Sequence, residues 1–205
     1  MYTELHARSA FSFLEGGALP EELASVCVER GMAAMALLDR DGVYGAPRFY
    51  LAAQKLSLRA HIGAEVTAAG GWRFPLLVET RTGYHNLCRL ITRMKLRARK
   101  GEGHVSDEEV AEKAAGLICL TGGREGPLAY ALSRGGIESG TVCVKQLCEI
   151  FGRTNVYVEL QRHLDRAEEA RNHAALEIAR KLRLPVVATN GVSYALPEQR
   201  EVLDV

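Results

Sequence analysis

The sequence predicts an α/β fold in which buried strands alternate with helices, and three observations predict it. Six short apolar runs are each followed by a segment with helical periodicity. Each run ends in a polar or glycine-rich cluster. The length of 205 residues, with 47% hydrophobic and 25% charged residues, suits one substantial core. Such βα units close into a barrel or spread into a doubly wound sheet, and the absence of GxGxxG after the first strand disfavours a dinucleotide-binding sheet.

The first half of the chain alternates strand and helix signals. Apolar runs predict strands over Tyr2–Leu5, Ala33–Leu38 and Leu58–Glu65. A helix is expected to begin at Pro20, because proline suits the first helical turn, and to close at Gly31. A second helix is expected over 45–57. Gly70 and Gly71 separate two strand-like runs within 66–80, which favours a hairpin.

The second half repeats the alternation. Residues 83–99 form an amphipathic helix with a basic outer face and an apolar inner face, to which we assign Leu87, Leu90, Ile91, Met94 and Leu96. Ser106 precedes an acidic run, the pattern of a helix N-cap and first turn. Further buried strands are expected over Leu117–Leu120, Val156–Leu160 and Pro185–Ala188. Helices are expected near 127–134, 140–151 and 165–183.

Composition limits the partners and the compartment. The formal net charge of +1 argues against a polybasic nucleic-acid module. No apolar run approaches the roughly 20 residues that span a bilayer, so no membrane partner is expected. The five cysteines include no CxxC pair, which argues against a zinc ribbon and a disulfide framework. Reduced, buried thiols and a cytoplasmic location are expected.

Residues at the ends of parallel strands converge on one rim of such a sheet, so the strand-end clusters predict one composite site. A hydrolytic metal centre needs several converging histidines and carboxylates. Side chains of these types lie near the predicted strand ends, namely His6, Glu15, Asp39, Glu65 and His163. Taken singly, they also suit a core histidine, turn residues or loop residues. Spacing alone leaves both readings open.

A family resemblance runs through these clusters. The segment from His6 to Gly16, HARSAFSFLEG, resembles the opening motif of PHP (polymerase and histidinol phosphatase) domains. The likeness is strongest to the PHP domain of bacterial C-family (DnaE-type) DNA polymerase III alpha subunits, and within these to the error-prone branch. Similar motifs follow in order, at Leu38–Gly45, Ile62–Val66, Gly83–Leu87, Gly116–Gly123, Val158–His163 and Ala188–Tyr194. The resemblance implies a distorted TIM-like (β/α)7 barrel.

The chain departs from the metal-binding pattern of that family. Histidines of the family's first and second motifs are replaced by Arg8 and Arg40. Gly123 stands where the fifth motif often has cysteine, and the last motif, normally Asn-Asp-Val-His, has Gly191 and Ser193 at two ligand positions. The ligand-type residues that remain are His6, Glu15, Glu65 and His163, a remnant of the implied metal set.

Arginine keeps its proton at accessible pH and cannot ligate a metal. We therefore expect Arg8, Asp39 and Arg40 to form a cleft ion-pair network that replaces the metals, and we expect no cofactor. One alternative keeps a single residual divalent metal, zinc or manganese, on His6, Glu65 and His163. The other keeps the metal-dependent phosphoesterase or 3′–5′ exonuclease activity of the family.

The basic stretch from Arg89 to Lys100 allows two interpretations. A stripe that includes Arg93, Arg97 and Arg99 could contact DNA phosphates or a neighbouring polymerase domain. A solvated helix face is the commoner explanation for such a run. No aromatic residue is interleaved with these cations, so base stacking on a single strand is not indicated.

Domain organisation follows from the resemblance. Residues 1–205 are expected to form a single PHP domain, and Glu201–Val205 resemble the middle of a helix, which indicates an N-terminal fragment of a longer polymerase. Its expected role is mainly structural, in replication or repair synthesis. Its expected partners are the remaining polymerase domains and, indirectly, DNA. Two rivals remain: a free-standing metallophosphoesterase of the histidinol phosphatase type, and a regulatory module separate from its polymerase.

Overall fold

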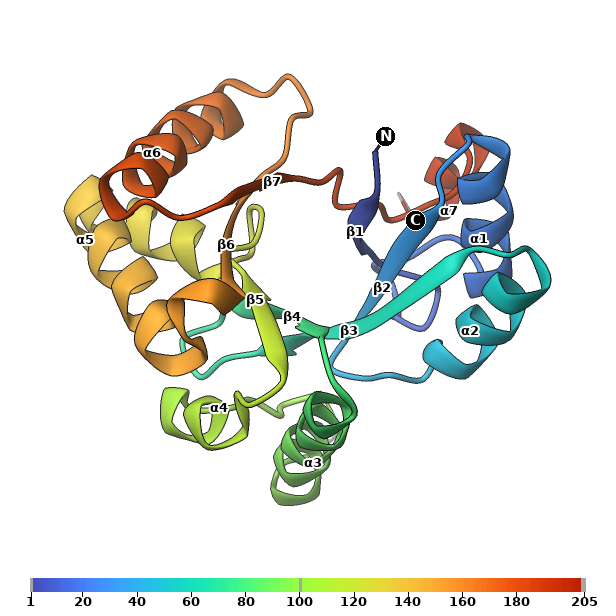
Figure 1. Cartoon of the computed structure of the whole chain (residues 1–205), viewed down its shortest axis with the longest axis horizontal. Helices are drawn as coiled ribbons and strands as arrows, with labels where there is room; N and C mark the ends of the chain where they lie inside the picture. Colours follow the sequence, from blue (N-terminus) through green and yellow to red (C-terminus); the bar gives the residue numbers. More distant parts are fainter. Residues whose placement is uncertain (1, 100, 204–205) are drawn as a thin grey trace.

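Seven strands form one curved sheet whose outer side is covered by helices (Figure 1). The computed structural model describes residues 2–99 and 101–203. The strands are neighbours in sequence order. They are β1 (Glu4–Ala7), β2 (Ala34–Arg40), β3 (Arg59–Thr67), β4 (Arg73–Val78), β5 (Leu117–Leu120), β6 (Val156–Leu160) and β7 (Val186–Ala188).

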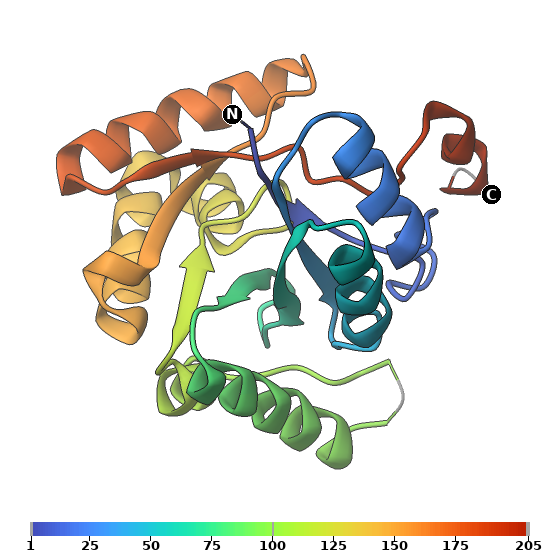
Figure 2. The same cartoon turned by 45° about the vertical axis from the view of Figure 1, so that its right-hand side comes forward.

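Helices follow most strands and lie outside the arc that the strands make (Figures 1 and 2). They are α1 (Pro20–Glu29), α2 (Ala46–Lys55), α3 (Arg81–Arg97), α4 (Asp107–Lys113), α5 (Pro127–Phe151), α6 (Arg166–Leu182) and α7 (Arg200–Leu203), with short 3₁₀ turns at Arg153–Asn155 and Pro197–Gln199. Ser106 and Glu109 form a reciprocal capping box at the start of α4, as the acidic run after a serine predicts.

The sheet is parallel except at β4, which runs antiparallel to both β3 and β5. Gly70 and Gly71 connect β3 to β4, so the predicted hairpin is confirmed. After β7 the chain returns to β1, where the N–H of Arg8 donates to the carbonyl of Val192 at 2.8 Å. An isolated parallel bridge between Ala7 and Val192 accompanies it. The sheet is therefore a distorted, incompletely closed TIM-like barrel.

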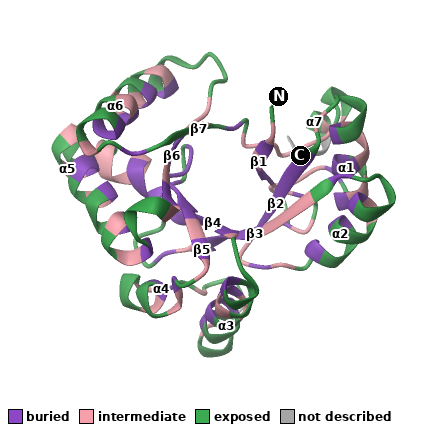
Figure 3. Cartoon of the chain, in the orientation of Figure 1, coloured by how far each residue is buried: buried purple, intermediate pink, exposed green. Residues whose placement is uncertain are grey.

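Buried side chains form three clusters, and buried residues concentrate on the central strands and the inner helix faces (Figure 3). The largest cluster lies between the sheet and α3 to α6, and a second one lies between the first strands and α1 and α2. A small third cluster joins β2, β4 and β5 through Ala36, Leu38, Leu77 and Leu120. The apolar runs thus supply a core on both sides of the strands, as a barrel requires.

Three local expectations need correction. Leu96 is 84% exposed, because it lies half a turn away from Leu87 around α3. Strand β7 is not buried: Val186 is 43% exposed, since the chain after β7 crosses toward β1 without a covering helix (Figure 1). Helix α5 has only a local break, at Gly135 and Gly136, so its second part begins earlier than expected.

Candidate functional site at the carboxyl ends of the strands

The strand ends do converge on one cavity. His6 lies on β1, Glu65 lies on β3, and His163 follows β6. Together with Arg8 they line a cavity of about 720 Å³. Because these strands are parallel, their carboxyl ends point the same way, and His6, Glu65 and His163 meet at this cavity. Glu15 and Asp39, predicted for the same site, do not line it.

His6 is buried between two carboxylates. Its Nε2 lies 2.8 Å from Oε1 of Glu65, and its Nδ1 lies 2.6 Å from Oε1 of Glu159. Burial alone lowers the pKa of His6, but the two carboxylates, Glu159 foremost, outweigh it and raise the pKa to about 10. Both ring nitrogens therefore donate, and the side chain is an imidazolium at neutral pH.

Glu65 is shared between His6 and Arg8. The Nη2 of Arg8 donates to Oε1 of Glu65 at 3.0 Å, and its Nε lies 2.6 Å from Oε2. Burial alone raises the pKa of Glu65, yet the hydrogen bond and charge of His6, followed by Arg8, lower it to about 2. Glu65 is therefore ionised, and two guanidinium nitrogens of Arg8 face its two oxygens as a fork. Of these oxygens only Oε1 accepts a hydrogen bond, whereas the buried Oε2 is in ionic contact with Arg8 without a hydrogen-bond partner among the described residues.

A second group of ion pairs surrounds Glu15. Arg40 donates to its Oε1, and Arg73 donates to Oε2 at 2.5 Å and to Oε1 at 2.9 Å. Glu125 extends the group, because its Oε2 accepts from Arg8 at 2.7 Å and from Arg73 at 3.2 Å. Three arginines and three carboxylates, Glu65 included, thus connect loops that are far apart in the sequence.

Asp39 is arranged differently from the ion-pair network expected for it. Its Oδ1 accepts from the N–H of Ser9 at 2.7 Å, and the hydroxyls of Ser9 and Ser12 donate to the carboxylate at 2.9 Å. Burial raises the pKa of Asp39, against these hydrogen bonds. The serines satisfy Asp39 because the loop after β1 folds over the end of β2, so Asp39 holds that loop and pairs with neither Arg8 nor Arg40.

Gln161 occupies space beside the glycines that replace two ligand-type residues. A Cβ on Gly123 would lie 2.1 Å from Oε1 of Gln161, and a Cβ on Gly191 would lie 2.7 Å from its Nε2. The amide donates to Glu159 at 3.0 Å and to Thr189 at 3.3 Å. Both glycines thus leave room for an amide that hydrogen-bonds Glu159, the partner of His6. Gly191 also has a φ of +57°, in the left-handed region that favours glycine.

His163 lines the same cavity but bonds elsewhere. Its Nδ1 lies 2.9 Å from Glu168, and its Nε2 lies 2.8 Å from the carbonyl of Asn190. The hydrogen bond to Glu168 is the main cause of a raised pKa for His163. Its contacts fasten the start of α6 to the segment after β7, and the structure gives it no bond to His6 or Glu65.

The donor set does not fit the metal centre that the family pattern implies. Each ring nitrogen of His6 lies within hydrogen-bond distance of a carboxylate, and the guanidinium of Arg8 is in contact with Glu65. A cation in direct contact with the carboxylate opposes a metal ion there. Within residues 2–99 and 101–203, no group of three or more histidine, cysteine, aspartate or glutamate side chains is arranged to hold a metal ion.

Sequence reasoning did not select several residues that complete the site, namely Glu159, Gln161, Arg73, Glu125 and Thr189. One signal was present: Glu159 is a charged residue inside the apolar strand Val156–Leu160. A buried charge in such a strand needs a partner, and His6 supplies it. Arg73 and Glu125 carried no local signal, because they lie on the hairpin and on the loop before α5.

Two arginines on the basic face of α3 pair with carboxylates of α4. Arg93 lies 3.1 Å from Glu112, and Arg97 donates to Oε2 of Glu109 at 2.7 Å. Arg99 is exposed beyond the end of α3, and Lys100 lies outside the described residues. Two of the three arginines proposed for phosphate contact therefore already have carboxylate partners.

These features define a barrel-like α/β domain whose rim carries a charged cluster. A family model for the PHP domain matches residues 4–163, and the chain belongs to the PHP domain family. An error-prone DNA polymerase of Mycolicibacterium paratuberculosis is 37% identical over 213 residues, covering 98% of this chain and 20% of that polymerase. One of Anaeromyxobacter sp. (strain K) is 37% identical over 207 residues, covering 98% and 18%. The chain thus spans about a fifth of these relatives.

Solved structures support the same fold at low sequence identity. A structure from Bifidobacterium adolescentis, assigned as a metal-dependent phosphoesterase, has a TM-score of 0.61 and 13% identity, and covers 93% of this chain and 87% of that one. A lesion-specific endonuclease from Pyrococcus furiosus has a TM-score of 0.56 and 14% identity, covering 96% and 49%. No helix in the described part of the chain has the length and apolarity to cross a membrane.

Proposed function

We propose that this PHP domain is a mainly structural part of an error-prone DNA polymerase, and that ion pairs do the work of the family's metal ions at its rim. The whole chain, residues 1–205, acts in this proposal as one domain that works in the cytoplasm. Identity of 36–37% to error-prone polymerases over nearly the full chain supports the polymerase assignment. The other polymerase domains are its expected partners, and DNA is an indirect one.

One observation carries the structural role: the charges at the rim compensate one another. His6 and Arg8 are cationic and lie against Glu65 and Glu159, while Glu15 accepts from two further arginines. The metal centre that the family pattern implies would gather its positive charge among such carboxylates. Here guanidinium and imidazolium groups supply that charge, so the loops of the rim are held together without a bound ion.

The alternative is retained metal-dependent phosphoester hydrolysis. It needs neutral imidazole nitrogens and a position open to water. A raised pKa of His6 and the Arg8 fork on Glu65 speak against it. A lone zinc or manganese ion on His6, Glu65 and His163 meets the same obstacle, and His163 is in addition bonded to Glu168 and Asn190.

Elemental analysis tests the proposal directly. Protein purified without chelator and then dialysed should carry no stoichiometric zinc or manganese, and added Mn²⁺ should not raise its melting temperature more than Mg²⁺ does. Stoichiometric metal that is lost in His6→Ala and kept in His173→Ala would overturn the proposal. Manganese-dependent release of nucleotides from DNA, with the same dependence on His6, would overturn it as well. His173 is a suitable control because it is exposed on α6.

A further inference from the structure

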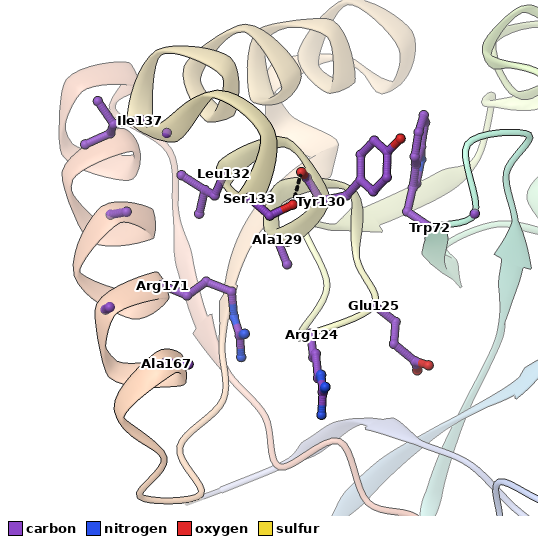
Figure 4. Close-up of a pocket in the computed structure, with 14 residues that line it drawn as sticks. Trp72, Arg124, Glu125, Ala129, Tyr130, Leu132, Ser133, Ile137, Ala167 and Arg171 are labelled. Carbon is purple, nitrogen blue, oxygen red and sulfur yellow. Dashed lines mark hydrogen bonds between the residues drawn. The ribbon is translucent and has the colours of Figure 1, made fainter.

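Two cavities meet beside the charged cluster. The rim cavity, which His6 and Arg8 line, adjoins a second cavity of about 610 Å³ between α5 and α6 (Figure 4). Both are lined by the same four residues, Arg124, Glu125, Ala167 and Arg171. The second cavity, called here the α5–α6 groove, lies outside the ring of ligand-type positions of the family.

Two arginines at this junction have few hydrogen bonds or ion pairs with other residues of the protein. Arg124 has no hydrogen bond or ion pair within the described residues, and Arg171 reaches only Oε1 of Glu168, at 3.5 Å. Figure 4 shows both guanidinium groups pointing the same way, into the space between the β5–α5 loop and α6. Arg8, by contrast, is in direct contact with Glu65 and Glu125.

The carboxylates near the junction are already engaged. Glu125 accepts hydrogen bonds from Arg8 and Arg73. Glu168 accepts one from the backbone N–H of His163, and its Oε1 lies 2.9 Å from the Nδ1 of the same residue. The two junction arginines are therefore free to bind an external anion. A guanidinium binds phosphate through parallel N–H donors, and two of them can grip one phosphoryl group.

Beyond the arginines the groove becomes apolar. Its walls are the facing sides of α5 and α6, lined by Ala129, Leu132, Ile137, Ala170 and Ala174. Small residues leave room between the helices. The paired rings of Trp72 and Tyr130, with centroids 4.6 Å apart, close one end (Figure 4). A ligand with an anionic group joined to a flat, weakly polar body would place the anion at the arginines and the flat body along the apolar wall.

We propose that the α5–α6 groove binds one nucleotide unit, with its phosphate between Arg124 and Arg171 and its base along the apolar wall. The choice of a nucleotide over other phosphorylated compounds rests on the proposed function. The unit can come from a free nucleotide or from the end of a single DNA strand. This binding is recognition without hydrolysis, because it uses none of the ligand-type residues.

The groove contains its own reporter, because Trp72 is the single tryptophan of the chain. Its fluorescence in the 205-residue protein is titrated with dTMP, with inorganic phosphate and with a short oligothymidylate. Binding of dTMP should be tighter than binding of phosphate, and Arg124→Ala and Arg171→Ala should each weaken it about tenfold, the value of one charge-assisted contact. Arg59→Ala, which removes an exposed arginine at the start of β3, should leave it unchanged.

A variant of the apolar wall separates the two halves of the proposed contact. Ala170 is exposed on α6, and its replacement by leucine narrows the groove. Ala170→Leu should therefore weaken the binding of dTMP and leave the binding of inorganic phosphate unchanged. Equal affinity for dTMP and phosphate, no dTMP binding at all, or equal loss in Arg59→Ala and Arg124→Ala would overturn the proposal.

Tighter binding of the oligonucleotide than of dTMP, dependent on Arg124, identifies a DNA strand as the source, and equal affinity identifies the free nucleotide. The test is also independent of the structural role. If dTMP does not bind while His6→Ala destabilises the metal-free chain, the groove inference fails and the proposed function stands. If stoichiometric metal is found while dTMP binding still depends on Arg124, the proposed function fails instead.

Discussion

Replacing His6 by alanine should destabilise the domain in a way that depends on pH. The imidazolium lies between the buried carboxylates of Glu65 and Glu159, and removing it leaves both with less compensation. Its pKa is raised from 6.5 to about 10. Proton linkage then gives a contribution of about 4 kcal/mol to the free energy of unfolding at pH 7. The lost side-chain packing adds about 1–2 kcal/mol that does not vary with pH.

The sign of the pH dependence follows from the raised pKa. Below pH 6.5 the contribution is complete, and it is lost as the pH rises through about 10. The difference between wild type and His6→Ala should therefore shrink by about 3 kcal/mol between pH 7 and pH 10. The thiols of buried Cys119 and half-buried Cys143 have raised pKa values and also reduce stability at high pH. Both proteins contain these thiols, so the difference isolates His6.

Urea unfolding, followed by the fluorescence of Trp72 and by circular dichroism, measures these free energies at several pH values. His173→Ala serves as the control and should stay within about 0.5 kcal/mol of wild type, because His173 is exposed. If His6→Ala is too unstable to fold, His6→Gln, which is close to histidine in size and carries no charge, takes its place. A wild-type protein that gains stability between pH 7 and pH 9, or a pH-independent effect of His6→Ala, would refute the buried imidazolium.

Three further predictions concern the neighbouring charges and the caps. Arg8→Met should cost about 2–3 kcal/mol in urea unfolding, because it removes the guanidinium fork from buried Glu65 while leaving His6 in place; an unchanged unfolding midpoint would contradict the fork. Ser106→Ala should cost about 1 kcal/mol by opening the capping box with Glu109, and Ser106→Thr should restore most of it. Arg97→Glu should lower the melting temperature at low salt, because it breaks the ion pair with Glu109. DNA binding in a low-salt mobility-shift assay should stay unchanged, because Arg97 is already paired. A loss of DNA binding in that assay would instead support the phosphate-contact interpretation.

The sequence by itself determined the order and type of the elements. A short, uniformly apolar run such as Ala33–Leu38 predicts a buried strand, because it has no polar face for solvent. The glycine pair between β3 and β4 predicts a hairpin, because glycine permits the tight turn. These patterns depend only on neighbouring residues, so they can be interpreted without knowledge of the fold. The substitutions at Arg8 and Arg40 were equally readable, because arginine cannot serve as a metal ligand in any fold.

Only the tertiary structure decided which charges meet. Arg73 and Glu125 are distant in the sequence from Glu15, and only the curvature of the sheet brings them together. For the same reason Asp39 could not be assigned in advance to its serines, nor Gln161 to its glycines. Periodicity and motif reveal which side chains lie near a rim, whereas hydrogen-bond partners depend on differences of about an ångström between loops, which the packing of the whole barrel sets.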